Sequence, residues 1–128
     1  MKKDILLEKS FAFAIRIVKM YKFLCESKKE FVISKQVLRS CTSIGANIRE
    51  SKRGQTTPDF YTKLTIALKE ADETAYWFKL FYKTNYLDEN TYESINNDCE
   101  ELIKLLVSST KTLKAKMIKK IFKKYYIV

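Results

Sequence analysis

Apolar side chains recur at steps of three and four residues along almost the whole chain, and little in the sequence interrupts them. The 128 residues include only two glycines and one proline, the residue types that most often break helices and form turns. The alternating pattern of strands never extends beyond a few residues. The sequence therefore predicts an all-α protein of long amphipathic helices joined by short connections.

The first two helices are predicted from their apolar stripes. Residues 4–26 form the first, and the second begins after Ser34, which we expect to be its N-cap. Gly54 follows the second helix, where we expect the left-handed conformation that glycine adopts without steric cost. The stripes consist of Leu7, Phe11, Ala14, Ile15, Val18, Tyr21 and Cys25 in the first helix and Val37, Cys41, Ile44 and Ile48 in the second.

The last two helices have clearer start signals. Thr57 can cap the third, Pro58 suits its first position, and Asp59 complements the positive end of the helix dipole. This helix should run to about Lys83, and Asp88 should cap the fourth. The stripes are Phe60, Leu64, Ala67, Leu68, Ala71, Ala75, Phe78 and Phe81, then Tyr92, Ile95, Cys99, Leu102, Leu106, Ser109 and Leu113.

Short connections between long helices favour an antiparallel, up-and-down four-helix bundle, which we assign to residues 1–114. The third helix ends in a dense group of aromatic residues, and this group allows two interpretations. The rings either exceed what one bundle can cover and promote self-association, or they close the end of the bundle with Trp77 half exposed. The group consists of Tyr76, Trp77, Phe78, Phe81 and Tyr82.

The sequence offers no catalytic constellation, and we expect no enzymatic activity, metal or cofactor. Histidine is absent, and the three cysteines lie at wide spacings without a C-x-x-C pair, as expected of reduced, mostly buried thiols. No secretory signal or membrane-spanning run is evident, so we expect a cytoplasmic protein. Four polar residues on the second and third helices are interpreted as a structural polar network, with solvated faces as the alternative. They are Asn47, Glu50, Glu70 and Glu73.

Most of the net charge of +10 lies at the end of the chain. Residues 111–128 carry seven lysines and no acid, which leaves residues 1–110 with eighteen bases and fifteen acids. We define residues 115–128 as the extension and expect it to continue the fourth helix as a basic amphipathic helix. The extension contains Lys116, Lys119, Lys120, Lys123 and Lys124, and a smaller basic cluster contains Arg39, Arg49, Lys52 and Arg53.

Three roles are open for the extension. Its lysines could bind nucleic-acid phosphates, with Phe122, Tyr125 and Tyr126 stacking on unpaired bases. Alternatively, the same lysines could hold the helix on an anionic membrane with its apolar side inserted. The remaining interpretation is a solubilising helix end whose lysines complement the helix dipole.

Two motifs on the predicted second and third helices point to a known family. Residues 43–50 read S-I-G-A-N-I-R-E and residues 67–77 read A-L-K-E-A-D-E-T-A-Y-W, while residues 10–14 read S-F-A-F-A. Together they resemble the bacterial four-helix-bundle proteins encoded within intervening sequences of 23S rRNA genes. The resemblance covers about residues 5–114 and leaves out the extension.

This resemblance implies an antiparallel bundle that assembles into a ring-shaped homopentamer. It also implies similarity to the accessory variability determinant of diversity-generating retroelements, which binds nucleic acid and a reverse transcriptase. Asn47, Glu50, Glu70 and Glu73 match the family's characteristic polar positions. No enzymatic activity is implied.

From charge and resemblance together, the hypothesis is an oligomeric bundle that binds RNA or a ribonucleoprotein through the basic residues of the extension and the smaller cluster. A protein-interaction scaffold or accessory subunit is the alternative, and a peripheral membrane protein is less favoured.

Overall fold

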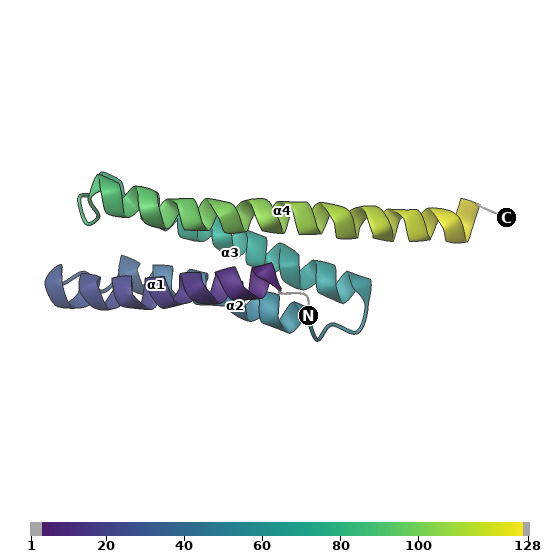
Figure 1. The fold of residues 1–128 in the computed structure, drawn as a ribbon, viewed down its shortest axis with the longest axis horizontal. Helices are drawn as coiled ribbons and strands as arrows, with labels where there is room; N and C mark the ends of the chain where they lie inside the picture. The colour runs from purple at the N-terminus through teal and green to yellow at the C-terminus, as the bar shows by residue number, and fades with distance from the viewer. Residues whose placement is uncertain (1–3, 127–128) are drawn as a thin grey trace.

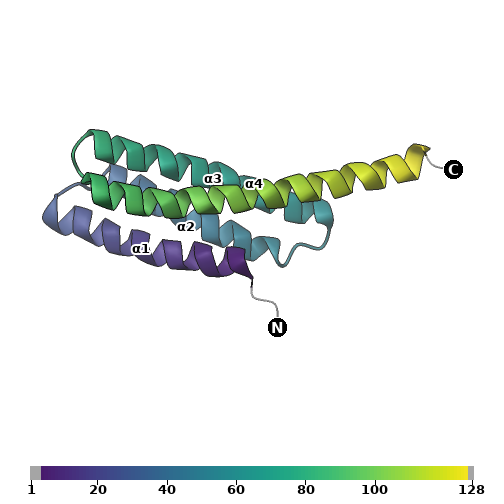
Figure 2. The same cartoon turned by 45° about the horizontal axis from the view of Figure 1, so that its top comes forward.

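The computed structural model describes residues 4–126, which form four helices: α1 (Ile5–Ser27), α2 (Ile33–Ser51), α3 (Thr57–Lys83) and α4 (Glu89–Tyr126) (Figure 1). No strand occurs within these residues, so the all-α prediction is confirmed. Each helix contacts the next one along the chain, and α1 also contacts α4. The α1–α2 and α3–α4 connections lie at one end of the molecule and the α2–α3 connection at the other (Figure 2).

All four helices contribute to one apolar core, which the predicted stripes identify correctly in α2, α3 and α4. The largest fully buried side chains include Phe13, Phe78 and Phe81. Phe13 and Phe78 meet edge to face with ring centroids 6.0 Å apart. Because burial of one such side chain contributes about 1.5–3 kcal/mol, this core is the main source of stability.

The predicted stripe of α1 is wrong. The buried side is formed by Leu6, Ser10, Phe13, Ile17, Met20 and Leu24. Three members of the predicted stripe are instead exposed, Phe11 by 69%, Ile15 by 45% and Val18 by 38%. The helix carries apolar residues on two sides, and both sides satisfy helical spacing equally well. Packing against α2 and α4 decides which side is buried.

The start of α2 also differs from the prediction. Ser34 lies inside the first turn and is not the N-cap. The Glu30 carboxylate caps the helix by accepting hydrogen bonds from the backbone N–H groups of Val32 (3.1 Å), Ile33 (2.9 Å) and Ser34 (2.7 Å). The Ser34 hydroxyl donates to the Glu30 carbonyl oxygen at 2.8 Å. A glutamate four residues earlier thus satisfies the free donors that a serine cap would have met.

The structure of the connection between α2 and α3 differs from two further predictions. Thr56, not Thr57, caps α3, because its side chain accepts from the Asp59 N–H at 3.3 Å. Gly54 does not adopt a positive φ. A Cβ atom there would lie 3.2 Å from the Ser51 carbonyl oxygen and 3.3 Å from the Phe60 nitrogen, so glycine is needed for close approach. Asp88 caps α4 as predicted, accepting from the Thr91 N–H at 2.7 Å.

The aromatic group at the end of α3 closes that end of the core. Phe78 and Phe81 are buried, and Tyr82 stacks on Tyr92 of α4 with ring centroids 4.6 Å apart. Trp77 is half-buried and donates its indole N–H to Glu73 at 3.1 Å. Only Tyr76 of this group is exposed. Of the two interpretations, the structure therefore agrees with the closing role.

Candidate nucleic-acid interface

The extension continues α4 as one uninterrupted helix as far as Tyr126, and it projects beyond the ends of the other helices (Figure 1). Met117 is half-buried at its start, where a hollow of about 250 Å³ separates it from Thr57 and Pro58 of α3. Every described residue after Met117 is exposed. Residues 127 and 128 lie outside the described part of the chain.

The lysines of the extension form one continuous positive strip. At 100° per residue, the five lysines occupy an arc of about 140° around the helix. All five are exposed, and within residues 4–126 none forms an ion pair. The Lys124 Nζ atom lies 5.4 Å from the centroid of the Tyr125 ring. The strip consists of Lys116, Lys119, Lys120, Lys123 and Lys124, and we call it the lysine face.

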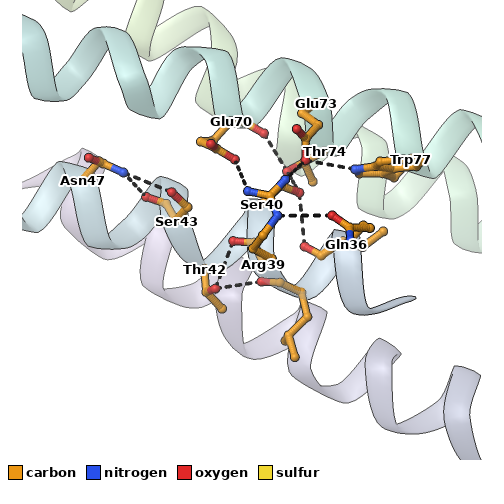
Figure 3. Close-up of polar contacts among 12 residues, drawn as sticks. Gln36, Arg39, Ser40, Thr42, Ser43, Asn47, Glu70, Glu73, Thr74 and Trp77 are labelled. Carbon is orange, nitrogen blue, oxygen red and sulfur yellow. Dashed lines mark hydrogen bonds and ion pairs between the residues drawn. The ribbon is translucent and has the colours of Figure 1, made fainter. Parts of the chain in front are cut away.

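Two members of the smaller basic cluster are neutralised by neighbouring acids. Arg39 bridges α2 and α3 by pairing with Glu70 (3.3 Å) and Glu73 (Figure 3). Lys52 pairs with Asp4 at 2.8 Å, and its Nζ atom lies 5.1 Å from the Phe60 ring centroid. Although partial burial raises the pKa of Asp4, the hydrogen bond and charge of Lys52 together with backbone hydrogen bonds from Leu7 and Leu6 outweigh it, and the Asp4 pKa falls below its ordinary value.

Arg49 and Arg53 differ from the other two members, since neither forms an ion pair with any described residue. Both side chains belong to exposed residues at the carboxyl end of α2. The α2–α3 connection lies at the same end of the molecule as the start of the extension (Figures 1 and 2). The fold thus brings two basic segments, far apart in the sequence, to one end.

The four predicted network residues do not meet in a single cluster. Glu70 and Glu73 share Arg39, which the prediction had assigned to the basic cluster (Figure 3). Asn47 bonds within its own helix, donating to the Ser43 carbonyl oxygen at 2.9 Å. Glu50 pairs with Lys63 of α3 at 2.8 Å.

A groove between α1 and α2 was missed in the sequence because the buried side of α1 was assigned incorrectly. It has a volume of about 540 Å³ and is lined mostly by apolar atoms. Gly45 and the exposed Phe11 are among the residues that line it. The small residues of the S-I-G-A-N-I-R-E motif are the sequence feature that could have indicated this groove. The lining residues are Leu7, Glu8, Ser10, Phe11, Ala14, Thr42, Gly45, Ala46 and Arg49.

Neither metal chemistry nor a membrane span finds support in the described residues. Among residues 4–126, no three His, Cys, Asp or Glu side chains gather in a way that could hold a metal ion. The Glu70 and Glu73 carboxylates instead bind the Arg39 guanidinium. None of the four described helices is long and apolar enough to cross a membrane.

Comparison with known proteins shows the family of the chain, and the similar solved structures include a crystal structure with high sequence identity. The model of the 23S rRNA-intervening sequence protein family matches residues 2–108, so the match ends before the extension. A crystal structure from Bacteroides thetaiotaomicron VPI-5482, described as a protein with unknown function from the S23 ribosomal protein family, is similar with a TM-score of 0.83. The two sequences are 57% identical over 84% of this chain and 99% of that chain. No curated protein matches the chain.

Proposed function

Because the chain belongs to the 23S rRNA-intervening sequence protein family, we propose that it is a non-enzymatic, oligomeric four-helix protein that binds nucleic acid, either RNA or a ribonucleoprotein. The lysine face is the observation that carries this proposal. Five exposed lysines, none of which pairs with an acid within residues 4–126, form a strip that can release counterions from phosphates on binding. Arg49 and Arg53, which form no ion pair with another described residue, add positive charge near the α2–α3 connection.

The protein acts as an antiparallel bundle that assembles into a homopentameric ring in the cytoplasm. Two features support assembly: the exposed apolar side chains of α1 and the groove beside them. A ring would display each lysine face five times, and simultaneous contacts raise avidity without stronger binding by each copy. A monomer mass at micromolar concentration in light scattering would contradict the ring.

A salt titration of RNA binding tests the nucleic-acid role. Phosphate contacts predict that log K falls linearly with log salt concentration, and that the slope becomes shallower when residues 115–128 are deleted. Arg39→Gln should leave the slope unchanged, because Arg39 is already neutralised by Glu70 and Glu73. Absence of binding at about 50 mM salt would overturn the proposal.

A protein-interaction scaffold is the second candidate, and the α1–α2 groove favours it. An apolar groove of this size can receive a helix from another protein. Recovery of a defined protein partner after nuclease treatment, together with its loss on Phe11→Ser substitution, would support this role. Nucleic-acid binding that survives Phe11→Ser would separate the two functions.

A further inference from the structure

The arrangement of side chains around the extension bears on the kind of nucleic acid it would contact. On the basis of the proposed nucleic-acid function, we infer that the lysine face binds the phosphate backbone of a double strand. The extension does not stack on the bases of a single strand. The aromatic rings of the extension then take no part in nucleic-acid contact. Three observations lead to this inference.

First, the rings and the lysines lie on different sides of the helix. At 100° per residue, Tyr125 lies about 170° from the centre of the lysine face and Phe122 lies about 130° from it. Tyr126 is nearer to the lysines, but its ring packs against the Phe122 ring with centroids 5.1 Å apart. The Phe122 and Tyr125 rings therefore lie across the helix from the centre of the lysine face, and of the five lysines Lys124 reaches the Tyr125 ring, with its Nζ atom 5.4 Å from the ring centroid.

Second, single-strand binding needs both kinds of group on one surface. Proteins that hold single strands combine a basic groove along the backbone with aromatic rings on which successive bases stack. A helix with its side chains is about 10 Å thick, so one nucleotide cannot contact the centre of the lysine face on one side and the Phe122 or Tyr125 ring on the other. In a duplex the bases already stack on one another, and only the phosphates need a partner.

Third, the density of lysines matches a duplex better than a single strand. Lys116 and Lys124 are eight residues apart, which corresponds to about 12 Å along the helix axis. Over that length a duplex presents about seven phosphate charges, and each of its strands presents about half as many. Five lysines within this distance exceed what one strand can neutralise.

Fluorescence anisotropy with the full chain tests the inference directly. The probes are a mixed-sequence RNA duplex, the corresponding DNA duplex and one of the RNA strands alone, each of about 20 nucleotides per strand. We expect the duplexes to bind about tenfold more tightly than the single strand, because of their higher charge density. The two duplex probes distinguish RNA from DNA as the source of the phosphates.

Two matched double variants separate the sides of the helix. Lys119→Gln with Lys123→Gln should make the salt slope for the duplex shallower by about 1.8. Phe122→Ala with Tyr125→Ala should change duplex affinity by less than about twofold, since neither ring faces the phosphates. All four residues are exposed, so we expect each variant to keep its helices, and circular dichroism checks this.

The possible outcomes are distinct. Single-strand binding as tight as duplex binding, or a loss of about fivefold or more in the aromatic variant, would overturn the inference and leave the proposed function standing. No binding of any probe at about 50 mM salt would overturn both. Vesicles containing phosphatidylserine serve as a further probe, because binding to them alone would replace nucleic acid with a membrane as the partner of the extension.

Discussion

At the scale of single residues, Glu30 shows how one side chain can define an element. Glu30 is buried, and its carboxylate accepts three backbone hydrogen bonds at the start of α2. Burial raises the pKa of this carboxyl group, but the hydrogen bonds from Ile33, Ser34 and Val32 outweigh burial, and the pKa falls below its ordinary value. The ionised form therefore stabilises the folded state.

Glu30→Gln should lower the free energy of unfolding by about 1–2 kcal/mol at pH 7, because a neutral amide caps less well. A carboxyl group whose pKa falls on folding stabilises fully above its unfolded pKa of about 4.3 and loses that contribution as the pH falls through the folded pKa. The difference between wild type and variant should thus vanish in acid. Urea unfolding between about pH 7 and pH 3 measures this, with the exposed Glu26→Gln as the control. A difference independent of pH would contradict the capping role.

The three cysteines differ from one another in how deeply they are buried. Cys41 and Cys99 are buried and Cys25 is half-buried, and all three are free. Burial raises the pKa of the Cys99 thiol to about 12, with nearby carboxylates acting in the same direction. Burial likewise raises the pKa of Cys41 far above its ordinary value. Thiolates, the reactive form, are therefore suppressed at both buried positions.

Labelling of the native protein with a thiol reagent near pH 8 should modify Cys25 rapidly and the two buried thiols only as the structure opens. In urea all three should react at similar rates, because burial no longer protects Cys41 and Cys99 or raises the pKa of their thiols. Cys25→Ser should abolish the rapid phase. Rapid labelling that persists in this variant would show that the core near Cys41 or Cys99 is open.

At the scale of elements, α1 and α2 approach each other at Gly45. A Cβ atom added there would lie 3.8 Å from the Ser10 carbonyl oxygen, which is an ordinary van der Waals distance. Gly54 is the opposite case, since a Cβ atom would lie within 3.3 Å of backbone atoms on both sides of the α2–α3 connection. The backbone around Gly45 therefore leaves room for a methyl group, whereas the backbone around Gly54 does not.

Gly45→Ala should stabilise the protein by about 0.5–1 kcal/mol, because alanine favours the helical backbone and its methyl group fits. Gly54→Ala should destabilise it by about 1 kcal/mol or more, because the new methyl group crowds rigid backbone. Urea unfolding of both variants at one protein concentration tests the pair. Destabilisation by Gly45→Ala would mean that the helices cannot accommodate even a methyl group at this crossing.

Another feature of the elements is how α1 is held against α4, the neighbouring pair with the least contact. Arg16 donates to the Ser94 hydroxyl at 3.0 Å and pairs with Asp98, while Lys9 pairs with Glu101. These side chains are about half exposed, and such pairs contribute about 1 kcal/mol or less each. The pairs therefore fix the position of α1 more than they add stability.

At the scale of the whole molecule, the extension is separate from the core. The buried residues of α4 end at Leu106, and every described residue beyond the half-buried Met117 is exposed. The family match, too, ends at residue 108. The core and the extension can therefore be varied independently.

Deletion of residues 115–128 should leave the melting temperature within about 2 °C of the full chain, because almost no apolar surface of the core is lost. The helical signal should fall only by the amount expected for residues 115–126. Thermal melts followed by circular dichroism test this. A decrease of about 10 °C would show that the extension belongs to the folding unit.

The sequence by itself determined the number of helices, most of their ends and the buried sides of α2, α3 and α4, because each of these helices has a single apolar stripe. It also located the excess charge, since the formal charge of each residue follows from its type and its place in the chain from the residue order. The tertiary structure decided which side of α1 is buried, because Phe11 and Phe13 are equally apolar and only the neighbouring helices distinguish them. It also decided which basic residues of the smaller cluster pair with acids among the described residues. In the sequence, nothing distinguishes Arg39 and Lys52 from Arg49 and Arg53. In the folded chain, Glu70 and Glu73 of α3 pair with Arg39, and Asp4 pairs with Lys52.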